Sequence, residues 1–198
     1  MNRFIVFEGL DACGKTTLSS LYAKEMNYVI HSAVVSEALE LRKVIDSYQS
    51  KESALLFFLL NNFLKSHEVS NALESRDVML DRYIFSTLAY QSIMLGENVV
   101  KQLFDTLNIT QKIRFPDVIV FVKADAETIN SRIESRGGIV QWYGDEITQN
   151  NCVETAYKKI FQWFNIPVIE IDTSEKYGRS VEDNYQLMKD RINRILTR

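Results

Sequence analysis

The sequence predicts an α/β domain built on a parallel sheet of about five strands, with helices on both faces. Short runs of β-branched and aromatic residues alternate along the chain with longer segments of helical periodicity. No repeat, low-complexity tract or Pro/Gly/Ser-rich linker interrupts this alternation, so we expect one domain over residues 1–198. A chain of 198 residues, 46% of them apolar, is long enough to bury the core of such a sheet.

Five segments are predicted as strands, because each is a short apolar run beside turn residues. They are residues 3–7, 28–35, 78–80, 117–125 and 167–171. The segments between them favour helices. These are residues 16–26, 37–75 with a break near 47–53, 86–95, 99–107, 126–136, 148–164 and 181–196. Strands that alternate with helices in this way are typical of a parallel sheet covered on both faces.

One helical stretch, residues 52–66, is apolar on nearly all sides. Its two apolar faces hold Leu55, Phe58, Leu59 and Phe63 on one side and Phe57, Leu60 and Leu64 on the other. A helix of this kind is buried on both sides. In a protein of this size it is therefore either a central core helix or a subunit interface.

The composition argues against several classes of protein. The chain has 23 Lys and Arg against 26 Asp and Glu, a net charge of −3, whereas nucleic-acid-binding proteins are normally basic. Cys13 and Cys152 have no metal-ligand spacing and imply no disulfide framework. The longest apolar run, residues 54–60, is far below the roughly 20 residues that span a bilayer, and the N-terminal run is too short for a signal peptide. We expect a cytoplasmic protein that binds neither nucleic acid nor membrane.

The first predicted strand leads into a phosphate-binding loop, residues 9–16, whose sequence GLDACGKT matches GxxxxGK[ST] at every fixed position. Gly9 and Gly14 allow backbone angles that turn N–H groups toward phosphate oxygens, and the following helix adds its positive N-terminus. Lys15 can reach the β- and γ-phosphates, and the Thr16 hydroxyl can bind Mg²⁺. The motif predicts a bound nucleoside triphosphate. The expected contacts are Gly9, Leu10, Asp11, Ala12, Cys13, Gly14, Lys15, Thr16 and Thr17.

The third predicted strand ends in Asp81, Arg82 and Tyr83. An acid at the carboxyl end of a parallel strand lies in the crevice where α/β sheets bind ligands. We expect Asp81 to hold Mg²⁺ or its water, and Arg82 to bind a second phosphate group. A GTPase is disfavoured, because the chain has no Asn-Lys dipeptide and its only Asp-x-x-Gly lies inside the phosphate-binding loop.

Five segments carry a resemblance to a known family. They are FIVFEGLDACGKTT at 4–17, ALLF at 54–57, LDRYIFSTLAYQ at 80–91, PDVIVFVKADAE at 116–127 and VIEID at 168–172. In order and approximate spacing they resemble the thymidylate kinase family over almost the full chain. The resemblance implies a P-loop kinase fold with a short lid at about 137–150, ATP as donor with Mg²⁺, and a homodimer. It also implies a nucleoside monophosphate acceptor, above all dTMP, which would give dTDP.

The resemblance also implies acceptor-site residues, position by position. Asp11 contacts the sugar or phosphate of the acceptor, and Arg42 and Arg82 hold its phosphate. The residues expected to line the base pocket are Ser86, Tyr90 and Gln91.

Two arginines are expected from the lid side. Arg136 would contact the γ-phosphate, and Arg132 would lie nearer the adenine and the α- and β-phosphates. Such an arginine contributes about 10³–10⁵ in rate, and the phosphate-binding loop, with Ala12 and Cys13, does not supply it. The expected catalytic residues are Lys15, Asp81, Arg82 and Arg136.

Two positions depart from the family pattern and leave the acceptor open. Ser36 and Asn61 stand where the family has arginines. One alternative is a nucleoside kinase on the same scaffold, which would need Glu37 or Asp81 to deprotonate a hydroxyl. A second alternative is a catalytically silent nucleotide-binding protein.

Overall fold

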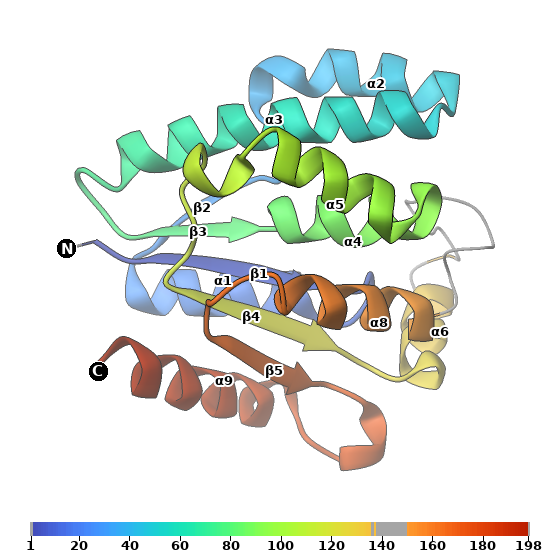
Figure 1. Cartoon of the computed structure of the whole chain (residues 1–198). Helices are drawn as coiled ribbons and strands as arrows, with labels where there is room; N and C mark the ends of the chain where they lie inside the picture. Colours follow the sequence, from blue (N-terminus) through green and yellow to red (C-terminus); the bar gives the residue numbers. More distant parts are fainter. Residues whose placement is uncertain (1, 136, 138–149, 198) are drawn as a thin grey trace.

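In the part of the chain that the structure describes, a five-stranded parallel sheet has the order β2-β3-β1-β4-β5 (Figure 1). The computed structural model describes residues 2–135, 137 and 150–197. The strands are β1 (Phe4–Gly9), β2 (Val29–His31), β3 (Val78–Asp81), β4 (Val118–Lys123) and β5 (Val168–Asp172). Each neighbouring pair is parallel, which confirms the predicted fold class.

Helices cover both faces of this sheet. They are α1 (Lys15–Met26), α2 (Leu39–Tyr48), α3 (Lys51–Ala72), α4 (Ile84–Leu95), α5 (Glu97–Thr106), α6 (Ala126–Ser135), α8 (Asn150–Phe161) and α9 (Val181–Leu196). Helices α1 and α9 pack on one face, and α3, α4 and α8 pack on the other (Figure 1). None of the described helices combines the length and apolar character that crossing a membrane requires.

The predicted break in the long helical segment is confirmed between α2 and α3. Gln49 ends α2 with a left-handed backbone (φ 51°), and Ser50 begins α3 as its N-cap. The Ser50 hydroxyl accepts a hydrogen bond from the N–H of Ser53 at 3.1 Å, which satisfies one of the free donors at the helix start. A left-handed residue followed by a side-chain cap turns the chain sharply.

The core lies along the central strands. All six residues of β1 are buried, and β4 is buried from Val118 to Val122. Such continuous apolar strands are expected where helices cover both faces of a parallel sheet. The predicted strand 28–35 is shorter, Val29–His31, because β2 lies at the edge of the sheet and pairs with β3 alone.

The strand register brings the predicted site to one edge of the sheet. Phe7 of β1 lies opposite Asp81 of β3, and Gly9 lies opposite Val122 of β4. A Cβ atom on Gly9 would lie 2.0 Å from the carbonyl oxygen of Val122, so only glycine fits where β1 enters the loop. The phosphate-binding loop and the Asp81-Arg82 pair therefore leave the sheet side by side.

Helix α3 is both a core helix and a surface helix. Leu55 and Leu59 are buried in the main core. On the opposite face, Leu56, Leu60 and Leu64 are 62%, 52% and 44% exposed. Their spacing of four residues makes one apolar stripe along the helix.

Candidate functional site

The phosphate-binding loop joins β1 to α1 and has the backbone of an anion nest. Ala12 and Gly14 have positive φ angles of 56° and 86°, and α1 begins at Lys15. A polar cavity of about 70 Å³ lies in the loop, lined by Leu10, Asp11, Ala12, Gly14, Lys15, Thr16 and Thr17. The free N–H groups at the start of α1 make this cavity attractive to an anion. The loop is therefore built to bind phosphate.

Cys13 is a packing residue within this loop. Its side chain is buried, and its thiol donates to the carbonyl of Leu10 at 2.9 Å. Burial raises the pKa of the Cys13 thiol, although the charge of Lys15 opposes this rise. A neutral, buried thiol is a poor nucleophile, so the side chain of Cys13 fills space in the loop.

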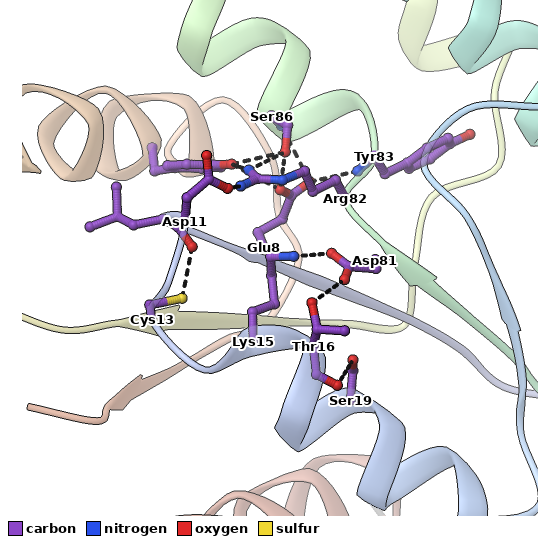
Figure 2. A network of polar contacts seen from close by, with 12 residues as sticks. Glu8, Asp11, Cys13, Lys15, Thr16, Ser19, Asp81, Arg82, Tyr83 and Ser86 are labelled. Carbon is purple, nitrogen blue, oxygen red and sulfur yellow. Dashed lines mark hydrogen bonds and ion pairs between the residues drawn. The ribbon is translucent and has the colours of Figure 1, made fainter. Parts of the chain in front are cut away.

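Lys15, Thr16 and Asp81 meet at the mouth of the loop (Figure 2). The Nζ atom of Lys15 forms an ion pair with Oδ1 of Asp81, and the Thr16 hydroxyl donates to Oδ2 of Asp81 at 2.9 Å. A hydroxyl and a carboxylate are hard oxygen ligands suited to Mg²⁺, which takes few protein ligands and completes its shell with water and nucleotide phosphates. Across the described ranges no group of three or more His, Cys, Asp or Glu forms a metal cluster. The residues present fit a metal ion that arrives with a nucleotide.

Arg82 points away from Lys15 and toward Asp11 (Figure 2). Its backbone is left-handed (φ 71°), and its N–H donates to the carbonyl of Phe7 at 2.8 Å. The guanidinium donates to Oδ1 of Asp11 at 2.5 Å and lies 5.6 Å from the ring centre of Tyr90. The Ser86 hydroxyl also accepts from the guanidinium, at 3.5 Å, so the structure brings together four residues predicted for the acceptor.

A buried carboxylate, Glu8, lies below Arg82. It accepts hydrogen bonds from the N–H groups of Tyr83 and Ser86 at 2.9 and 3.2 Å and from the hydroxyls of Ser86 and Tyr157. Burial raises the pKa of Glu8, while the Ser86 hydrogen bond and the charge of Arg82 oppose this rise. Glu8 therefore links the start of α4 to the residues that surround Arg82.

Tyr157 reaches the same network from α8. Its hydroxyl donates to Glu8 at 3.0 Å and accepts from Arg82 at 3.1 Å. Burial raises the pKa of the Tyr157 hydroxyl, so it stays protonated and able to donate. Lys123 at the end of β4 pairs with Glu154 of α8 at 2.9 Å, which fixes this helix over the site.

Glu8 and Tyr157 were absent from the sequence-based site. For Glu8 a signal existed, since an acid in the buried run FIVFEG needs hydrogen-bond partners inside the protein. No local signal marked Tyr157, because its contacts depend on how α8 packs against α4 and the sheet.

Arg132 of α6 lies against the phosphate-binding loop. It donates to the carbonyls of Ala12 and Thr173 at 3.3 and 2.9 Å. Arg136 and residues 138–149 of the expected lid lie outside the described residues.

The other expected acceptor residues have structural contacts of their own. Arg42 is buried on α2, where its Nε donates to Asp46 at 2.6 Å and its guanidinium lies 4.5 Å from the ring centre of Phe58. Gln91 is buried on α4, and among the described residues its Oε1 has no hydrogen-bond partner. Their roles at the acceptor stay predictions.

Asn61, at one of the positions that depart from the family, supports the loop after β2. Its Oδ1 accepts from the N–H of Val35 at 3.0 Å, and its Nδ2 donates to the carbonyl of Ala33 at 2.8 Å. Both the oxygen and the nitrogen of this buried amide are hydrogen-bonded to backbone groups, so Asn61 stabilises the loop.

Glu37, a candidate base of the nucleoside-kinase alternative, is exposed and accepts from the Ser36 hydroxyl at 2.9 Å. Hydrogen bonds from its own N–H and from Ser36 lower the pKa of Glu37, which makes it a weaker base. Asp81, the other candidate base, already accepts hydrogen bonds from the Lys15 ammonium group and the Thr16 hydroxyl.

Comparison with known proteins gives matches over most of the chain. The family model described as thymidylate kinase matches residues 7–184. A probable thymidylate kinase of Methanocaldococcus jannaschii is 33% identical over 188 residues, which cover 92% of this chain and 91% of that protein. The structure of thymidylate kinase from Candida albicans aligns with a TM-score of 0.75 at 20% identity, covering 97% of this chain and 91% of that one. Deoxyadenosine kinase from M. mycoides with bound dATP aligns with a TM-score of 0.70 at 16% identity, covering 97% of this chain and 100% of that one. At such low identity the two structures establish the shared fold.

Proposed function

This chain belongs to the thymidylate kinase family and is a nucleoside monophosphate kinase; we propose that it transfers the γ-phosphoryl group of ATP to dTMP, giving ADP and dTDP. One observation carries the proposal. The consecutive residues Asp81 and Arg82 face different ways: Asp81 contacts Lys15 and Thr16, whereas the Arg82 guanidinium contacts Asp11 and Tyr157. An acid beside the donor loop and a cation turned away from it suit a donor and an acceptor that exchange a phosphoryl group.

Catalysis on this site rests on positioning and on charge. An oxygen of the acceptor phosphate attacks the γ-phosphorus of ATP, and the bond from that phosphorus to the β-phosphate oxygen breaks. The attacking phosphate is already an anion, so no general base is required. Lys15 and the N–H groups of the phosphate-binding loop neutralise the donor phosphates, while Arg82 orients the acceptor phosphate. Thr16 and Asp81 would hold Mg²⁺, which neutralises charge on the β- and γ-phosphate oxygens when bound.

We extend this proposal to the lid side from the sequence. Arg136 supplies the positive charge at the γ-phosphate, and Arg132 lies nearer the adenine and the α- and β-phosphates. The position of Arg132 beside Ala12 supports its part in this assignment. The remaining acceptor contacts are assigned to Arg42, Ser86, Tyr90 and Gln91. We further propose that the enzyme is cytoplasmic and that it binds no nucleic acid. Its net charge of −3 supports the second point.

The decisive test is ADP release from Mg-ATP with a panel of acceptors: dTMP, dUMP, UMP, CMP, dCMP, AMP, GMP, thymidine and deoxycytidine. We expect dTMP to give the highest kcat/KM because the chain belongs to the thymidylate kinase family, and we expect every monophosphate to exceed its nucleoside because Arg82 offers a cation to a phosphate. Turnover with a nucleoside alone would establish the nucleoside-kinase alternative. Bound ATP with no turnover on any acceptor would establish a silent nucleotide-binding protein.

The apolar stripe on α3 supports the proposed homodimer. Leu56, Leu60 and Leu64 together expose a contiguous apolar face that a second copy of the chain would bury. We expect Leu60→Glu to shift the protein from dimer to monomer, because a charge would be buried without a partner. Sedimentation velocity measures this shift, and Val181→Glu, at a 55% exposed position on α9, is the matched control. A native chain that sediments as a monomer would refute the dimer.

A further inference from the structure

Thr173, just after β5, connects two parts of the expected nucleotide site, the phosphate-binding loop and Arg132. It is 7% exposed, and its hydroxyl donates to the carbonyl of Cys13 in the phosphate-binding loop at 2.7 Å. The same hydroxyl accepts a hydrogen bond from Nη1 of Arg132 at 3.1 Å, and the Thr173 carbonyl accepts from Nη2 at 2.9 Å. A single side chain thus joins the loop to the arginine expected beside the nucleotide.

The carbonyls that are held in this way decide where the loop N–H groups point. Each peptide group is planar and trans, so its N–H points opposite to its C=O. The carbonyl of Ala12, bound by Arg132 at 3.3 Å, belongs to the same peptide as the N–H of Cys13. The carbonyl of Cys13, bound by Thr173, belongs to the same peptide as the N–H of Gly14. Donors on one side of the loop therefore fix two N–H groups on the other side, where phosphate binds.

Thr173 is itself held independently of the loop. Its N–H donates to the carbonyl of Lys123 at 2.8 Å, which continues the ladder between β4 and β5. The sheet thus sets the position of the hydroxyl before any nucleotide binds. A rigid donor of this kind lowers the ordering cost of the loop when phosphate enters.

We propose that Thr173 is a positioning residue for ATP, whose hydroxyl holds the Cys13–Gly14 peptide and Arg132 in the orientation that binds the donor phosphates. This inference rests on the proposed function only in requiring that the chain binds ATP. Thr173 acts through the loop and through Arg132. Its contribution should therefore be found in donor affinity and not in acceptor affinity.

The test compares Thr173→Val, which keeps the shape and removes the hydroxyl, with Thr173→Ser, which keeps the hydroxyl. Titration calorimetry with a non-hydrolysable ATP analogue and Mg²⁺, without acceptor, measures the dissociation constant. We expect Thr173→Val to raise it by roughly five- to twentyfold, as for one lost buried hydrogen bond, and Thr173→Ser to stay within about twofold of the native value. In turnover, KM for ATP rises with Thr173→Val while KM for dTMP does not.

Thr128→Val is the matched control. The hydroxyl of this buried threonine accepts from the N–H of Glu175, in the same loop after β5, at 2.9 Å. Its loss weakens that loop, where Glu175 pairs with Arg132 at 3.6 Å, but leaves the hydrogen bonds of Thr173 to Cys13 and Arg132 in place. ATP affinity should therefore stay at the native value.

Several outcomes would overturn the inference. These are native affinity in Thr173→Val, equal losses in the valine and serine variants, or an equal loss in Thr128→Val. If Thr173→Val is not recovered folded, Thr173→Ala replaces it in the same comparison and must show the same loss. If the native chain binds ATP but does not turn over dTMP, the proposed acceptor is refuted and the role of Thr173 is not. If the native chain binds no ATP, both the proposed function and the role of Thr173 are refuted.

Discussion

Replacing Lys15 with alanine is expected to lower kcat/KM for phosphoryl transfer by roughly 10³-fold, with the fold retained. Lys15 is buried at the start of α1, where its ammonium group faces Asp81 at the mouth of the phosphate-binding loop. Without it, negative charge that develops on the donor phosphates is left uncompensated. The carboxylate of Asp81 would then repel those phosphates at close range.

The measurement is steady-state ADP release at varied Mg-ATP, together with thermal unfolding to show that the variant is folded. Lys24→Ala is the matched control, since this lysine lies on the exposed side of the same helix and should behave like the native enzyme. A Lys15→Ala enzyme that kept more than a tenth of native kcat/KM would contradict the assigned role.

Replacing Arg82 with glutamine is expected to lower kcat/KM for dTMP by roughly 10²–10³-fold while the dissociation constant for ATP stays within about twofold. A guanidinium binds a phosphate through two parallel charge-assisted hydrogen bonds, each worth about 1.5–3 kcal/mol. The loss also leaves the carboxylate of Asp11 without its cation and Glu8 without a neighbouring positive charge. Arg82→Lys should recover only part of the activity, because an ammonium group cannot form the paired contact.

Separate titrations of dTMP and ATP distinguish the acceptor effect from the donor effect. Arg76→Gln, at an exposed arginine shortly before β3, is the control for a lost surface charge. If Arg82→Gln weakened ATP binding and left dTMP binding unaffected, the assignment of Arg82 to the acceptor phosphate would be wrong.

The first variant is expected to affect the donor and the second the acceptor, because the side chains of Asp81 and Arg82 point in different directions. Asp81 is the last residue of β3, where it contacts Lys15 and Thr16. The backbone of Arg82 is left-handed, and its own side chain points toward Asp11 and Tyr157 instead. In the proposed reaction, this one strand end would therefore serve both substrates.

Much of the fold could be predicted from the sequence, because its signals are local. The central strands are short, mostly apolar runs, broken in β1 only by Glu8, that a sheet covered on both faces can bury. The break between α2 and α3 also followed from residues within the segment itself. The edge strand β2 was predicted too long, since the extent of its pairing depends on β3, which lies nearly fifty residues further along the chain.

The site divides in the same way. The sequence alone determined the phosphate-binding loop, because a continuous motif between a strand and a helix contains its own geometry. It predicted Asp81 and Arg82 from their place at the end of a strand, and the register of β1 and β3 brings them beside the loop. Only the tertiary structure joined Glu8 to Tyr157, 149 residues away, and Thr173 to Cys13, 160 residues away. It also showed that Asn61 supports the loop after β2. These partners depend on the strand order and register of the sheet, which bring distant side chains into contact through packing that no local pattern encodes.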